Sequence, residues 1–86
     1  MTLSQLRRHI DRLDERLLML LSQRGELALR VGKIKKRQGK GLFDSARERV
    51  ILRQVVKANG GPLSGRAVRA IYREILKQMR RLEQSA

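Results

Sequence analysis

The sequence predicts an all-α domain with one long helix and two shorter ones, and three observations support this. Apolar residues recur at alternating steps of three and four from Leu3 to Ile34, the spacing of a long helix with a coiled-coil-like face. Gly and Pro interrupt the chain at two later points, which separates the shorter helices. No stretch alternates between apolar and polar residues long enough to predict a strand. With 86 residues, the chain is expected to form a single domain over residues 1–86.

The long helix is predicted over about residues 3–37 and carries a continuous apolar face, called here the apolar seam. A helix of this length spans roughly 50 Å, more than a compact domain of this size, so a monomer would leave much of the seam uncovered. We therefore expect a second copy of the chain to cover it. Gly25 and Gly32 interrupt good helix formers, which indicates close approach of another segment to the backbone there. The seam consists of Leu3, Leu6, Ile10, Leu13, Leu17, Leu20, Leu27, Val31 and Ile34.

A loop is predicted over about residues 38–43, because Gly39 and Gly41 break the helical pattern. The second helix is predicted over about residues 45–58, where Ser45 and Glu48 have the spacing of a capping box.

The third helix is predicted over about residues 65–84, after the sequence NGGPLS, with Ser64 as its N-cap. Its spacing predicts an inward apolar face. This face comprises Ala67, Val68, Ile71, Tyr72, Ile75, Met79 and Leu82.

The charge of the chain indicates an anionic partner. Lys and Arg number 21 against 8 acidic residues, giving a formal net charge of +13. Only 2% of the residues are aromatic, which argues against stacking on single-stranded nucleic acid, so nucleic acid is not the expected partner. The lack of an uninterrupted apolar run predicts no membrane span, so a membrane is not expected either. The chain has no Cys and one His, so no metal site is expected. The first residues lack an uninterrupted apolar run, which predicts a cytoplasmic protein without a signal peptide.

Arg24 occupies a position on the apolar seam where the spacing calls for an apolar residue. It could fix the register of a helix pair, extend its guanidinium group to water, or hold an anionic ligand. Lys35 lies eleven residues later, which returns to within roughly 20° of the same direction and about 16 Å away, so both can reach one small ligand. Arg7 lies about 100° round the helix and about 25 Å from Arg24. It could serve a ligand held by the partner in an antiparallel dimer.

Three segments, in this order, resemble the AroQ-type chorismate mutases. Residues 6–35, LRRHIDRLDERLLMLLSQRGELALRVGKIK, contain the L-R-x-x-I-D, L-x-x-R and V-G-x-x-K motifs of the long first helix of that family. FDSARERVIL resembles its second-helix D-x-x-R-E motif, and IYREILKQMRRLE its third helix. The pattern is most similar to the small mutase domains that are fused to, or work beside, DAHP synthase, which makes that enzyme a candidate partner.

This resemblance implies an intertwined all-helical homodimer that converts chorismate to prephenate for aromatic amino acid biosynthesis in the shikimate pathway. The rearrangement is pericyclic and needs no cofactor, so the site must position a dianion and stabilise charge on its ether oxygen. Catalytic roles are implied for Lys35, Glu83 and Arg24. Substrate-binding roles are implied for Arg7 from the partner subunit, Arg24, Lys35, Asp44, Arg47 and Glu48.

Two positions depart from the family pattern. Glu83 stands where many members have Gln, and a carboxylate cannot donate a hydrogen bond unless it is protonated. We therefore expect activity to fall as the pH rises through the titration of Glu83. Met79 stands where many members have a small or polar residue, and we interpret it as core filling.

Other functions remain alternatives. The same fold could carry an isochorismate pyruvate lyase-like activity, which uses similar cations. It could also be a regulatory mutase-like domain whose main role is to bind DAHP synthase. A further group of basic residues has no role in any of these interpretations, namely Arg66, Arg69, Arg73, Lys77, Arg80 and Arg81.

Overall fold

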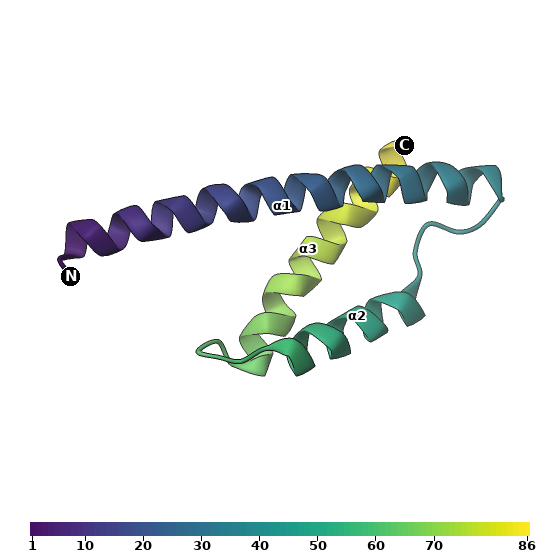
Figure 1. The fold of residues 1–86 in the computed structure, drawn as a ribbon. Coiled ribbons are helices and arrows are strands. Elements are labelled where there is room, and N and C mark those ends of the chain that lie inside the picture. Colours follow the sequence, from purple (N-terminus) through teal and green to yellow (C-terminus); the bar gives the residue numbers. More distant parts are fainter.

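The computed structural model describes all of residues 1–86 and contains three α-helices and no strand. Helix α1 comprises Leu3–Arg37, α2 comprises Ser45–Ala58 and α3 comprises Gly65–Ser85. Figure 1 shows α1 as a long rod, with α3 crossing its C-terminal half and α2 returning beneath it. The predicted all-α class, with one long helix and two shorter ones, is confirmed.

Side-chain caps fix where each helix begins. Thr2 and Gln5 form a capping box at the start of α1. Ser64 caps α3 as predicted, accepting a hydrogen bond from the Ala67 amide at 3.1 Å.

The predicted capping box of Ser45 and Glu48 is wrong. Asp44 is the N-cap of α2, and its Oδ1 accepts a hydrogen bond from the Arg47 amide at 3.0 Å. Ser45 is instead the first residue of the helix. The Glu48 side chain is therefore free of the helix end and pairs with α3.

Helix α3 packs on α1 through a stripe of small residues beside the apolar seam. Gly25, Ala28 and Gly32 are the buried residues of α1. A Cβ atom at Gly32 would lie 2.5 Å from the carbonyl oxygen of Glu83, so only glycine allows this approach. The close backbone approach that the two glycines predicted is confirmed.

The inward face of α3 differs in part from the predicted one. Val68, Leu76, Met79 and Glu83 are buried. Leu76 was not expected there, whereas Ile71, which was expected to face inward, is 48% exposed within one chain. Helix α2 packs on α3 and not on α1, so the apolar face of α3 turns toward two neighbours at different points along its length.

The N-terminal half of α1 has no neighbour within the chain (Figure 1). The longest dimension of the molecule is 54 Å, and its radius of gyration is 15.8 Å, against about 12 Å for a compact domain of this length. Leu6, Ile10 and Leu13 of the apolar seam are each about half exposed. One chain therefore leaves a long apolar face in contact with solvent. No helix is both long enough and apolar enough to cross a membrane.

Candidate active site

A cavity of about 510 Å³ lies among the three helices and the α1–α2 loop. Its size falls in the range of small-molecule binding sites. Six of the residues predicted for the site line this cavity, and they come from all three helices and the loop: Arg24, Lys35, Asp44, Arg47, Glu48 and Glu83. Arg7 lies on the uncovered half of α1 and does not line it.

Lys35 and Glu83 form an ion pair in the cavity wall. Lys35 Nζ donates to Glu83 Oε1 at 3.1 Å and to the carbonyl oxygen of Leu42 at 3.1 Å. The side chains are 19% and 11% exposed, so the pair is shielded from most solvent. An ammonium group has three donors, which leaves one N–H of Lys35 for a ligand. Lys35 thereby joins α1 to the α1–α2 loop and to the end of α3.

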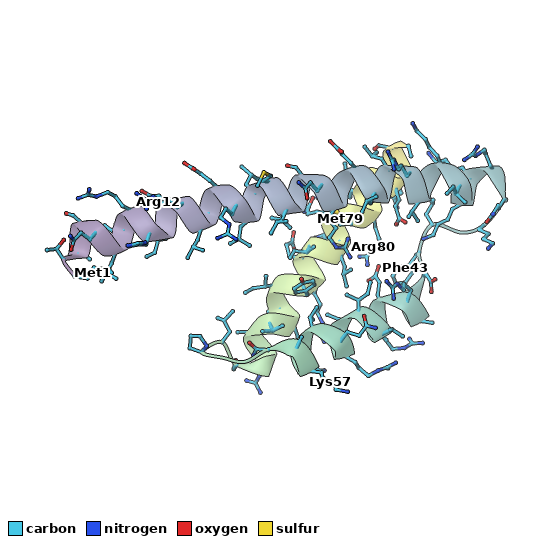
Figure 2. All side chains as sticks on the ribbon, viewed as in Figure 1. Met1, Arg12, Phe43, Lys57, Met79 and Arg80 are labelled. Carbon is cyan, nitrogen blue, oxygen red and sulfur yellow. The ribbon has the colours of Figure 1, made fainter.

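Glu48 is held by an arginine that the motif does not include. Arg80 Nη1 donates to Glu48 Oε1 at 2.6 Å and to Oε2 at 2.7 Å. The guanidinium carbon of Arg80 also lies 4.8 Å from the centroid of the Phe43 ring, a distance typical of a cation–π contact. Figure 2 shows Arg80 and Phe43 in the space enclosed by the three helices.

Arg24 and Arg47 form no ion pair, although both line the cavity. Arg24 comes from α1 and is partly buried, whereas Arg47 comes from the first turn of α2 and is exposed. Two guanidinium groups without a carboxylate partner can each hold a carboxylate of a ligand through paired N–H donors. The cavity therefore offers binding groups for an organic anion.

Arg80 is a charged residue of the cavity that was not predicted for the site, because the sequence places it only among the basic residues without a role. It lies three residues before Glu83, a spacing that puts the two on one face of a helix, and this was the available signal. Met79 is 8% exposed and also lines the cavity. Its interpretation as apolar filling agrees with this burial.

A second, smaller hollow lies between α2 and α3 and shares no residue with the first. It is lined by Leu52 and four arginines, Arg49, Arg53, Arg69 and Arg73, without a carboxylate. Two of the basic residues without a predicted role, Arg69 and Arg73, lie here. No group of three or more His, Cys, Asp or Glu side chains is arranged to hold a metal ion.

Comparison with known proteins identifies relatives along almost the whole chain. A bifunctional chorismate mutase/prephenate dehydratase of Aquifex aeolicus is 39% identical over 85 residues, which are 94% of this chain and 24% of that protein. A protein of the same description from Pseudomonas aeruginosa is 37% identical, over 95% of this chain and 24% of its own length. The chain thus spans about a quarter of the length of these curated relatives.

Solved structures of the same fold are also similar in sequence. Chorismate mutase (Form II) from Thermus thermophilus has a TM-score of 0.93 and 32% identity, covering 94% of this chain and 92% of that one. Chorismate mutase from Helicobacter pylori, solved in complex with prephenate, has a TM-score of 0.88 and 32% identity, covering 96% of this chain and 90% of that one. The chorismate mutase type II family matches residues 6–84 of the sequence. The fold, the arrangement of the cavity and this match together show that the chain belongs to the chorismate mutase type II family.

Proposed function

We propose that this chain catalyses the rearrangement of chorismate to prephenate. The observation that carries the proposal is the convergence of Arg24, Lys35 and Arg47 from two helices on one cavity of suitable size. Related chorismate mutases share the fold, and one of them was solved with prephenate bound. In this reaction the ether C–O bond breaks while a C–C bond forms within the same molecule, so no proton, electron or cofactor is exchanged.

The cavity would act by holding chorismate in its reactive conformation and by stabilising charge on the ether oxygen. Arg24 and Arg47 are free to bind carboxylates, and Arg7 of the partner subunit would add a third guanidinium group. The free N–H of Lys35 would donate to the ether oxygen and a neighbouring carboxylate. Glu48 and the backbone of Asp44 would bind the substrate hydroxyl group.

The proposed active form is a homodimer. The uncovered apolar seam on α1 supports it, because burial of apolar surface is the main driving force of association. A dimer in which the long helices run antiparallel would bring the N-terminal half of one α1 toward the cavity of the other chain. Arg7 would then reach a site that lies beyond its range within its own chain.

Two expectations from the sequence, the partner enzyme and the location in the cell, remain predictions. The expected partnership with DAHP synthase has no support from the relatives described above, whose second activity is prephenate dehydratase. If the chain were instead a regulatory domain that binds DAHP synthase, its turnover alone would be weak and would rise when DAHP synthase is added. The cytoplasmic location is likewise a prediction from the sequence.

The test is an assay of the purified chain with chorismate, following the loss of its absorbance and the appearance of prephenate. Isochorismate is offered in parallel, with pyruvate release as the readout. We expect prephenate from chorismate and no pyruvate from isochorismate. Pyruvate release as the main activity would assign the cavity to the lyase reaction, and no turnover of either compound would overturn the proposal.

A further inference from the structure

Arg80 lies in the cavity wall and pairs with Glu48 across it. Its Nη1 group contacts both oxygens of Glu48, and its side chain remains 30% exposed. A guanidinium group has five N–H donors, and those of Nη2 and Nε form no hydrogen bond within the chain. Arg80 can therefore hold Glu48 and still present positive charge and donors to the cavity that it lines.

Arg80 also contributes to the net charge of the cavity. Four cationic side chains, Arg24, Lys35, Arg47 and Arg80, face three anionic ones, Asp44, Glu48 and Glu83, so the cavity of one chain has a net charge of +1. With all three carboxylates ionised, Arg7 of the partner subunit would bring the completed site to +2, opposite in sign to a dianionic substrate. Without Arg80 the completed site would have a net charge of only +1. Because two opposite charges attract each other more strongly the closer they lie, a charge in the cavity wall contributes directly to the binding of a dianion.

We propose that Arg80 is a positioning residue of this active site, which fixes the Glu48 carboxylate at the cavity wall and supplies positive charge that favours the binding of a dianion. This inference rests on the proposed function. The contact with Phe43 holds the guanidinium plane in place from the loop side, so Arg80 joins the α1–α2 loop, α2 and α3 at one point. Glu48 then presents its carboxylate in one orientation to the substrate hydroxyl group.

The two contributions of Arg80 predict different kinetic effects. Loss of the positive charge weakens binding of the dianion and raises KM. Loss of the planar fork lets Glu48 move, which lowers kcat, because a displacement of about 1 Å in a positioning group costs up to about 100-fold in rate. A role confined to joining the helices would instead lower thermal stability and leave both constants of the folded protein unchanged.

The experiment compares Arg80→Leu and Arg80→Lys with the unchanged chain. Arg81→Leu is the matched control, because Arg81 is exposed, is the next residue of α3 and does not line the cavity. We expect Arg80→Leu to raise KM and to lower kcat by about 10- to 100-fold. Arg80→Lys keeps the charge without the planar fork, so KM should stay close to its original value while kcat falls. Arg81→Leu should change neither constant.

A second measurement separates the effect of Arg80 on Glu48 from any effect of the substitution on folding. Arg80→Leu is made again in a Glu48→Gln background, and circular dichroism establishes the folded fraction of every variant. If Arg80 acts through Glu48, its loss should lower kcat much less in this background than in the original chain. An equal reduction in both backgrounds, or unchanged kcat and KM in folded Arg80→Leu, would overturn the inference while leaving the proposed function intact. If the chain without any substitution does not convert chorismate, the proposed function itself is overturned.

Discussion

Gly32 of α1 lies directly against the backbone of Glu83 in α3. A Cβ atom at position 32 would come within 2.5 Å of the Glu83 carbonyl oxygen and 2.7 Å of its Cα. Backbone atoms cannot rotate away as the end of a side chain can, so Glu83 of α3 can lie this close to α1 only because residue 32 is glycine. Because Glu83 is paired with Lys35, the packing of two helices also sets the position of an ion pair in the active-site cavity.

Gly32→Ala is therefore expected to reduce both stability and activity. Alanine would gain about 1 kcal/mol of helix propensity, but the displacement of α3 should cost about 1–3 kcal/mol and move Glu83. Thermal denaturation and the chorismate assay check the two effects. Gly25→Ala is the control, because its Cβ would meet only the end of the Leu82 side chain, at 3.0 Å. Equal effects of the two substitutions would contradict this account of Gly32.

Glu83→Gln is expected to change the dependence of activity on pH. The ion pair with Lys35 requires the charged carboxylate, which accepts hydrogen bonds and cannot donate one to the ether oxygen. Activity of the original chain should be lower at alkaline pH than at acid pH, because only a protonated carboxyl group can donate to the ether oxygen. Glutamine donates at every pH, so the profile of the variant should be flatter. Identical profiles, measured as kcat/KM against pH, would remove Glu83 from this role.

Mixing two inactive variants tests the shared active site. Arg7→Ala and Arg24→Ala should each lose activity, because every site of the proposed dimer needs Arg24 from one chain and Arg7 from the other. After unfolding and refolding together, half of the dimers should be mixed, and each of these should contain one intact site. Activity should therefore return to about one quarter of that of the original chain. If no activity returns in a sample that sedimentation shows to be dimeric, Arg7 does not complete the active site of the partner subunit.

The sequence alone predicts most of the fold, because the helices of this chain carry strong local signals. The spacing of the apolar seam and the Gly-rich interruptions predict three helices, and Ser64 marks the start of α3. The cap of α2 is mispredicted because Ser45 follows Asp44, and both residue types are good N-caps. A local pattern cannot separate two adjacent candidates, since the choice depends on which side chain reaches the free amides.

The family motifs predict six residues of the cavity, but they do not predict Arg80. The contacts of Arg80 with Glu48 and Phe43 join segments more than thirty positions apart in the chain, and no local periodicity reports such a pairing. Burial of Leu76 and exposure of Ile71 escape the sequence pattern for a related reason. Both are apolar residues of one amphipathic helix, and the positions of the helices that pack on α3 decide which of them is covered.

We infer that Arg24 stands on the apolar seam because it binds a carboxylate of chorismate. The most direct measurement compares prephenate formation by the original chain, by Arg24→Ala and by Arg30→Ala, an exposed arginine of the same helix that does not line the cavity. We expect the original chain and Arg30→Ala to form prephenate at similar rates, and Arg24→Ala to lose about 100-fold or more in kcat/KM. If turnover is equal in all three proteins, Arg24 does not bind the substrate, and its role is to fix the register of the helix pair.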